Sequence, residues 1–525
     1  MKLVILCGLF APIIYLALRQ KKWYLYLLFA FYAVLPEQFS VKLHESIPLV
    51  SASRVLIVLF MAFWLFDKWK TRRFRFPKSL MVFLGISLIV SLVNLRYGGQ
   101  EIKRMFLLIF ERALLVIMVA DTIESREEFD RCVDFAIMGC CTMAVMGLSQ
   151  TIFGYNIASA LHLTETVTSI VLSDRMGLTR AYATMNAISF GCYCAFMVLP
   201  IYYRLQGTGK KRYSVAFALN LVALIATFTR SAWLCAAGIV ALVFLTRPWK
   251  MLRSLWFSAV LVVVLCLGLG FVQPKFGSAL LETTKSAYNT IVKVLPEEWF
   301  YDEPEVTEPT QTTVTEPTTT ETTEPTIEPT TEPTTEPTTE PTTEPTTEPT
   351  TEPTTEPTEP APTEPQGPEL ELDENFGPNA SDPTYTRMVQ WTAVQYMADE
   401  GELLFGYGYN AMLRGKIRFF FDRWHNYWIT SSFLDVGLVA LITESGLIGA
   451  IAHLSLFAFM LLQSLRKKDR KGQFDFYKVI IFTVPLYLLL NFLAAYVNGA
   501  AVWLVIGLFY AYERLRKEDA IEQKD

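Results

Sequence analysis

Long apolar runs recur along almost the whole chain, and they constrain its fold more than any other feature. Residues 221–227, 255–271 and 480–490 show neither the alternation of a half-buried strand nor the single apolar stripe of a surface helix. Helices that are apolar on every side belong in lipid. Only 18% of the 525 residues are charged, against about 25% in soluble globular domains. We therefore expect an all-α polytopic membrane protein.

The apolar runs have the length that a bilayer requires. A crossing helix needs about 20 apolar residues, and on this measure the sequence predicts about twelve to thirteen transmembrane helices. The candidate spans are 3–18, 23–36, 54–67, 79–95, 104–121, 132–153, 183–203, 213–229, 231–246, 254–272, 440–463, 476–495 and 498–512. We interpret the first as a membrane helix rather than a signal peptide, because its basic residues follow the apolar run.

Short clusters of basic residues predict how the chain is oriented in the membrane. They are Arg19–Lys22, Lys68–Lys78, Arg204–Arg212, Arg247–Arg253, Arg466–Lys471 and Arg514–Lys517. With thirteen spans and the N-terminus outside, all of them fall on one face, which is then the cytoplasmic face of the cell membrane. The long stretch at 273–432 becomes one large extracytoplasmic loop.

This orientation divides the chain into transmembrane helices (1–174 and 175–272), the loop (273–432), further transmembrane helices (433–513) and a cytoplasmic tail (514–525). Within the loop, residues 307–365 mostly repeat Thr-Thr-Glu-Pro, and a proline at every fourth position excludes helix and sheet. We expect a disordered, extended spacer there, either a tolerated insertion or a dedicated element. The last part of the loop, 370–432, should be ordered.

Arg230 stands between two apolar spans with almost no loop, at the predicted outer boundary of the membrane. Such a charged group either snorkels to the surface or faces a polar cavity, where its guanidinium could pair with phosphate oxygens. Arg175 and Arg180 add positive charge on the same side. Arg387 opens a helix predicted at 384–400, where it either faces solvent or joins the same site. Arginines that converge from separate loops would bind an anionic lipid headgroup.

His425 lies in the ordered part of the loop, just before a span and among aromatic residues. Histidine can accept a proton near neutral pH, although a lone histidine is more often structural. The eight cysteines have no metal-ligand spacing, and no phosphate-binding loop or dinucleotide motif is present. We expect no metal, no cofactor and no nucleic-acid partner.

Four short pieces of the sequence resemble, in their order, the O-antigen ligase and polymerase family of bacterial membrane glycosyltransferases. The pieces are 180–186, 229–233, Arg387 with Trp391 followed by 406–408, and His425 with Asn426 followed by 444–449. The stretch after His425 is longer than the family pattern, so Asp435–Leu438 is an alternative match for the last piece. The Thr-Glu-Pro tract is foreign to the family, but it precedes Arg387 and would leave the site intact.

The resemblance implies a metal-independent, inverting transfer of a glycan from undecaprenyl pyrophosphate to a hydroxyl of an acceptor glycan, lipid or protein. It implies that Arg230 and Arg387 engage the pyrophosphate and that His425 is the base. The residues that we expect to contact substrate beside them are Arg175, Arg180, Trp391, Trp424 and Asn426. A transporter or flippase of lipid-linked sugars, or a non-catalytic membrane protein that displays the stalk, are the alternatives. Membrane lipids surround the chain in every case.

Overall fold

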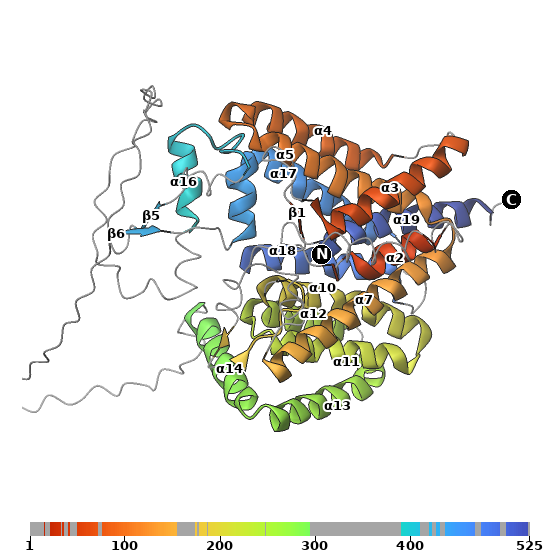
Figure 1. Cartoon of the computed structure of the whole chain (residues 1–525), viewed down its shortest axis with the longest axis vertical. Helices are drawn as coiled ribbons and strands as arrows, with labels where there is room; N and C mark the ends of the chain where they lie inside the picture. The colour runs from red at the N-terminus through yellow and green to blue at the C-terminus, as the bar shows by residue number, and fades with distance from the viewer. Residues whose placement is uncertain are drawn as a thin grey trace, which may run out of the picture. The chain divides into compact units, whose positions relative to one another are not determined.

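The computed structural model of the chain describes residues 15, 22–32, 34–35, 40–41, 50–71, 76–154, 174–175, 178–185, 187–246, 248–294, 390–409, 419–422, 427–430, 436–467, 474–493 and 500–522. All of them belong to one compact unit, formed by 1–295 and 376–525, and most are helical (Figure 1). The other unit, 296–375, which includes the Thr-Glu-Pro tract, and most of the predicted span 3–18 lie outside the described residues.

The elements up to residue 153 are α2 (Trp23–Phe31), β1 (Ser40–Val41), β2 (Val50–Ser51), α3 (Ala52–Thr71), α4 (Lys78–Val93), the 3-10 turn η1 (Asn94–Tyr97), α5 (Gln100–Phe106), the π-helical segment η2 (Leu107–Ala113), α6 (Leu114–Thr122) and α7 (Arg126–Phe153). Next come β3 (Asp174–Arg175), β4 (Leu178–Thr179), α10 (Ala187–Thr208), α11 (Lys211–Ala226), α12 (Arg230–Thr246), α13 (Pro248–Val272) and α14 (Lys275–Val294). The last are α16 (Thr392–Asp399), β5 (Phe419–Asp422), β6 (Tyr427–Thr430), α17 (Gly437–Arg466), α18 (Phe476–Leu493) and α19 (Ala500–Glu522). The strands form antiparallel pairs, β1 with β2, β3 with β4 and β5 with β6.

The helices of the described part make the chain a helical membrane protein. Six of them are long and apolar enough to cross a bilayer: α4 together with η1, α7, α10, α13, α17 and α18. α12 is apolar but shorter. The remaining predicted spans that the structure describes coincide with α2, α3, α11, α19 and the run from α5 to α6. α3 and α19 are long, but charged residues occupy their last turns.

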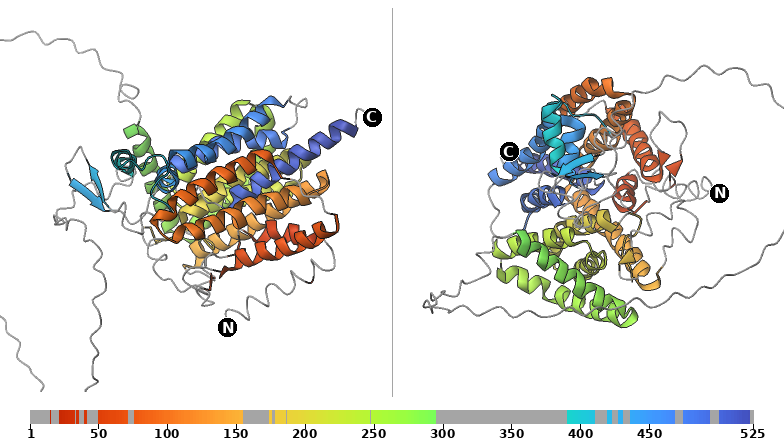
Figure 2. Two further views of the ribbon diagram at one scale, coloured as in Figure 1. Left: turned by 90° about the horizontal axis from the view of Figure 1, so that it is seen from above. Right: turned by 90° about the vertical axis from the view of Figure 1, so that its left-hand side faces the viewer.

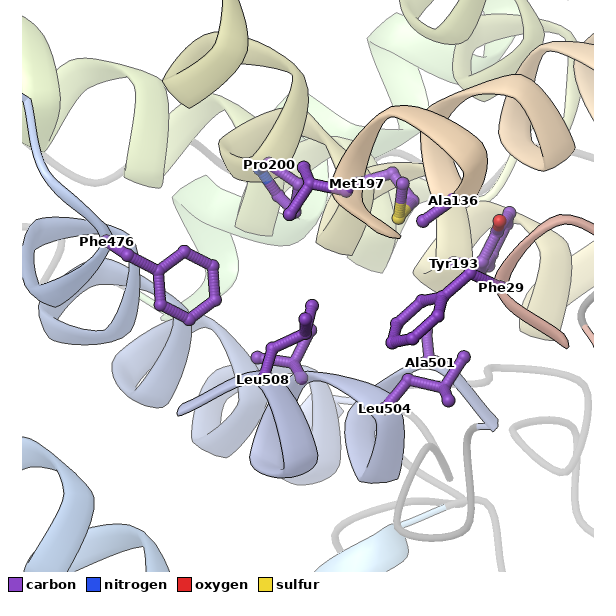
Figure 3. Close-up of a pocket in the computed structure, with 11 residues that line it drawn as sticks. Phe29, Ala136, Tyr193, Met197, Pro200, Phe476, Ala501, Leu504 and Leu508 are labelled. Carbon is purple, nitrogen blue, oxygen red and sulfur yellow. The ribbon is translucent and has the colours of Figure 1, made fainter. Parts of the chain in front are cut away.

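The long helices run side by side, and α14 and α16 lie at one end of them (Figure 2). Their interior is apolar. A gap of about 30 Å³ remains between α2, α7, α10, α18 and α19, and the side chains that line it, among them Phe29, Met197 and Leu504, are almost entirely hydrocarbon (Figure 3). A small apolar cavity of this kind stays dry. It is a packing gap rather than a ligand site.

Ion pairs join the other ends of the helices. Arg204 of α10 bonds both carboxylate oxygens of Asp134 on α7, at 2.6 and 3.0 Å, and contacts Asp130 at 2.5 Å. Lys68 of α3 pairs with Asp121 at 2.7 Å. The same layer contains the pairs Lys22–Glu124, Arg126–Asp519 and Lys467–Glu513. Lys517 also pairs with Glu513, at 3.4 Å. Members of five predicted basic clusters therefore take part in these pairs, and Ser254, directly after the sixth cluster at Arg247–Arg253, accepts a hydrogen bond from Gln206 of α10.

The sequence prediction missed α14, which opens the region expected to be a loop. Phe276, Ala279 and Ala287 of this helix are buried, and their spacing is that of an amphipathic helix. The predicted tail at 514–525 is also helical as far as Glu522, because α19 continues beyond the apolar part of its sequence.

We predict that Asp134→Ala lowers the free energy of unfolding of the detergent-solubilised protein by about 2–3 kcal/mol, because the nearly buried Arg204 loses two hydrogen bonds to a carboxylate and keeps only Asp130 as a close counter-charge. Glu127→Ala on the same helix is the control. Glu127 pairs with Arg131 at the surface, so its loss should cost no more than about 1 kcal/mol. Equal melting temperatures of the two variants would contradict a structural role for the Arg204 cluster.

Candidate functional site

The turn between α11 and α12 consists of Thr227, Phe228 and Thr229. Phe228 has a φ of +50°, which costs a non-glycine residue roughly 1–3 kcal/mol. Its buried ring lies 5.7 Å, centroid to centroid, from the ring of Phe276 on α14. The Thr227 hydroxyl donates to the carbonyl of Leu224 at 2.7 Å and closes the last turn of α11. Packing and hydrogen bonds thus hold a strained turn, a feature that clusters at functional sites.

Arg180 holds this turn from the segment before α10. Its Nε donates to the carbonyl of Thr227 at 2.7 Å, and its Nη2 donates to Thr229 Oγ1 at 3.0 Å. The next residue, Ala181, donates its N–H to the carbonyl of Ala226 at 2.9 Å. Arg180 therefore positions the residues that directly precede Arg230, a role that the sequence alone did not indicate.

Gln150 of α7 also fixes the segment before α10. Its Oε1 accepts the N–H groups of Tyr182 and Ala183, at 3.2 and 2.7 Å, and its Nε2 donates to the carbonyl of Ala183 at 2.8 Å. The buried amide satisfies three backbone groups of an irregular segment, in which Ala183 has a φ of +50°. Buried backbone groups need such partners. Sequence reasoning overlooked Gln150, although a glutamine inside a predicted span was a usable signal.

Arg230 begins α12 and is half-buried. Its Nη1 donates to the hydroxyl of Ser286 on α14. The guanidinium therefore lies between the first turn of α12 and the amphipathic helix α14. Its five N–H donors in a rigid fork suit an anion with several oxygens.

A second irregular place lies within α17, where Gly446 has φ +63° and ψ −175°. The neighbouring chain at 402–409 replaces the helical hydrogen bonds lost there. The N–H of Leu447 donates to the carbonyl of Leu403 at 2.9 Å, and the N–H of Tyr407 donates to the carbonyl of Thr443 at 2.8 Å. A Cβ on Gly446 would stand 2.2 Å from the carbonyl oxygen of Leu404. The two chains meet at a distance that only glycine permits.

Side chains from α4 and α5 also bind this break. Asn94, fully buried at the end of α4, donates to the carbonyl of Phe405 at 2.7 Å and to that of Glu444 at 3.4 Å. Arg104 of α5 donates to the same Glu444 carbonyl at 2.8 Å. The pieces 406–408 and 444–449, which belong to two different parts of the family resemblance, therefore lie together, and α4 and α5 hold them.

Two tyrosines follow in the docked chain. The Tyr407 hydroxyl donates to Glu400 Oε2 at 2.7 Å, and the Glu101 carboxylate accepts the N–H of Tyr409. Burial raises the pKa of both phenols above its ordinary value. Both therefore stay protonated at neutral pH, so neither is suited to act as a base.

Trp391 precedes α16, and its ring lies 6.0 Å from that of Phe492 at the end of α18. The adjacent Gln390 accepts the N–H of Val436, just before α17, at 3.2 Å. α18 packs against both α12 and α17. It thus connects the helix that Arg230 begins with the helix that Gly446 interrupts.

The structure places the predicted site residues only in part. Arg180 and Arg230 are brought together by the turn at 227–229, and Trp391 belongs to the second part of the site. The backbone of Arg175 lies in β3, paired with Leu178. Outside the described residues lie Arg387, Trp424, His425 and Asn426. The last three belong to the segment between the ends of β5 and β6.

Among the residues that the structure describes, no group of three or more His, Cys, Asp or Glu side chains could hold a metal ion. No known protein family, no curated protein and no solved structure matches the chain. The candidate site is therefore characterised by its own geometry, which combines two clamped backbone irregularities with arginines at both.

We predict that Gly446→Ala loosens the junction between 402–409 and α17, because the new methyl group meets a carbonyl oxygen and the φ is strained for alanine. The expected cost is at least about 2 kcal/mol. Hydrogen–deuterium exchange at Leu447 and Tyr407 should accelerate.

Gly270→Ala is the matched control for this substitution. Gly270 lies within α13, and a Cβ there would have open space around it. Unchanged exchange in Gly446→Ala would show that the close approach is not required.

Proposed function

We propose that the chain is a membrane glycosyltransferase of the O-antigen ligase and polymerase type. It transfers a glycan from undecaprenyl pyrophosphate to an acceptor hydroxyl at the outer face of the plasma membrane. The observation that carries the proposal is the arrangement of Arg180, the turn at 227–229 and Arg230. One arginine is used to fix the turn, and a second is presented directly after it at the end of the helices.

The pairing of distant segments supports the same proposal. Residues 180–185 contact the turn that leads into 229–233, and 406–408 dock on the break at 444–446. These are four of the segments on which the family resemblance rests. If these short matches had arisen by chance, the matched segments would not be expected to contact one another in pairs.

The chemistry follows from the groups in these segments. The acceptor hydroxyl attacks the anomeric carbon, the bond from that carbon to the pyrophosphate oxygen breaks, and the carbon is inverted. Arg230 and Arg387 stabilise the negative charge that grows on the leaving pyrophosphate. His425 takes the proton of the hydroxyl. Arg180 acts through its hold on the turn, and Arg175, Trp391, Trp424 and Asn426 bind the substrate. No metal ion takes part.

The layer of ion pairs supports the proposed orientation. It gathers basic clusters at the helix ends opposite to α14 and α16, and the cytoplasmic side of membrane proteins is rich in such residues. With thirteen spans, the candidate site then faces outward, together with the loop at 273–432. Lipid-linked glycans are presented on that side in the proposed reaction.

We predict that Arg230→Ala lowers glycan transfer by about 100-fold or more, because a preorganised charge at the leaving group is lost. His425→Ala should be equally inactive, and both variants should insert normally. Arg253→Ala, an exposed arginine on α13, is the control and should keep full activity. Transfer is measured as surface polysaccharide together with lipid-linked precursor.

The location of the precursor separates the proposed function from the alternatives. A transferase without activity leaves precursor at the outer leaflet, whereas an inactive flippase leaves it at the inner leaflet. A stalk protein without catalytic function would tolerate both Arg230→Ala and His425→Ala. Normal polysaccharide in Arg230→Ala would therefore refute the mechanism.

We also predict that deletion of residues 307–365 leaves transfer within about threefold of wild type, since a solvated spacer contributes no packed core and loop length has a small entropic cost. The comparison is made at equal amounts of protein in the membrane. Complete loss of transfer in the deletion variant would assign the tract an active role.

A further inference from the structure

α14 follows the membrane-crossing helix α13 after a short break and turns across one end of the long helices (Figures 1 and 2). The N–H of Gln273 still continues α13 by donating to the carbonyl of Leu269 at 2.8 Å. The next residue, Pro274, has no N–H and cannot extend that helix. α14 therefore begins at the level where the span of α13 ends, and a helix at this level can contact protein, lipid and water together.

One side of α14 packs against the protein. Its buried side chains recur every three or four residues, at Phe276, Ala279, Thr283 and Ala287, which is the spacing of one helix face. The ring of Phe276 contacts Phe228 in the α11–α12 turn. Ser286, at the edge of this side, accepts the hydrogen bond from Arg230. This side fixes how α14 is rotated about its own axis.

A second side of α14 is apolar but exposed. Leu281 and Tyr288 are 73% and 60% exposed, and at 3.6 residues per turn they point within about 20° of each other. Gly277 and Thr284 lie beside them. The Thr284 hydroxyl donates to the carbonyl of Leu280 at 2.8 Å, so its proton is already used inside the helix. We call these four residues, Gly277, Leu281, Thr284 and Tyr288, the apolar flank of α14.

The charged residues of α14 lie on a third side. Between residues 275 and 288 they are Lys275, Glu282 and Lys285, and all three are exposed. Glu282 points about 100° away from Leu281 and about 120° away from Tyr288. The exposed surface of α14 is therefore divided into an apolar part and a charged part. Such a division is expected where a helix meets two solvents rather than water alone.

The surface of α13 indicates what covers the apolar flank. α13 is long and apolar enough to cross a membrane, and little of it is buried in the protein. At its end, Leu267, Phe271 and Val272 are exposed, so this part of α13 faces lipid. The series of exposed apolar side chains then continues into α14 at Leu281 and Tyr288. Tyrosine suits the boundary between lipid and water, because its ring is apolar and its hydroxyl is polar.

We infer that α14 is an interfacial helix, whose apolar flank binds the membrane surface at this end of the long helices and whose charged side faces water. The partner is the boundary between the headgroups and the acyl chains of the phospholipid bilayer, where amphipathic helices bury their apolar residues. Neither the proposed reaction nor the orientation of the chain enters into this inference. Lipid is then a second support, beside the packing of Phe276, for the helix that carries Ser286.

Photocrosslinking identifies what covers the flank. A photoreactive benzoylphenylalanine replaces Leu281 or Tyr288 on the apolar flank, or Glu282 on the charged side as the matched control, since all three positions are exposed. The full chain is irradiated in phosphatidylethanolamine–phosphatidylglycerol vesicles, and the adducts are identified by mass spectrometry. Phospholipid adducts should form at Leu281 and Tyr288 at least about fivefold more often than at Glu282, because the two sides lie in different solvents.

Two outcomes of this experiment would overturn the inference. Equal yields of phospholipid adducts at Leu281, Tyr288 and Glu282 would show that the flank is not directed at the membrane. Adducts of Leu281 and Tyr288 with a second copy of the chain, in place of phospholipid, would show that protein covers the flank.

Hydrogen–deuterium exchange gives a second readout. In phospholipid nanodiscs, combining Leu281→Ser with Tyr288→Ser should accelerate amide exchange in α14 by about tenfold, because the apolar contacts with lipid are lost. Glu282→Ser combined with Lys285→Ser is the control, which places two serines on the same helix at exposed positions of the charged side. Equal exchange in the two double variants would contradict support of α14 by lipid.

Discussion

Inside a bilayer, a peptide N–H or C=O has no water to bond, so the chain can leave helical geometry only where other protein groups replace the lost hydrogen bonds. The structure meets this requirement in two ways. At the α11–α12 turn, side chains do so, because Arg180 takes the free carbonyl of Thr227. At Gly446, a second stretch of backbone does so, and Asn94 adds a side-chain amide. The candidate site consists of these two irregular segments, the α11–α12 turn and the break at Gly446.

The two arginines near the turn, Arg180 and Arg230, differ in the groups to which they donate hydrogen bonds. Arg180 directs two of its N–H groups at the turn itself, so its removal exposes backbone groups that have no replacement. Arg230 donates through Nη1 to the hydroxyl of Ser286 on α14. A charged group at such depth is retained where it has a task. Arg180 is thus a positioning residue, and in the proposed mechanism Arg230 is the arginine that meets the ligand.

Much of the fold was accessible from the sequence, because hydropathy depends on composition within one segment. The predicted spans from 23–36 onward fall on helices that the structure describes, with shifts of about five residues or fewer at most ends; α7 and α13 each begin six residues earlier and α19 ends ten residues later than predicted. α14 escaped notice, since Lys275, Glu282 and Lys285 mask its apolar face in a plain hydropathy scan. Its periodicity of three and four would have revealed it.

The contacts of the site depend on segments far apart in the chain, and the sequence alone could not supply them. Asn94 and Arg104 lie at the ends of predicted spans, where polar residues are ordinary. Their importance comes from the Glu444 carbonyl, about 340 residues away along the chain. The meeting of Gly406 with Gly446 was likewise hidden, although the family resemblance named both segments.

The contact between Arg230 and Ser286 has a thermodynamic consequence. A ligand that takes the same N–H of Nη1 has to displace the serine hydroxyl, so binding at that N–H and docking of α14 through Ser286 oppose each other. Linkage is reciprocal: whatever draws α14 away raises the affinity of the arginine for its ligand by the same factor.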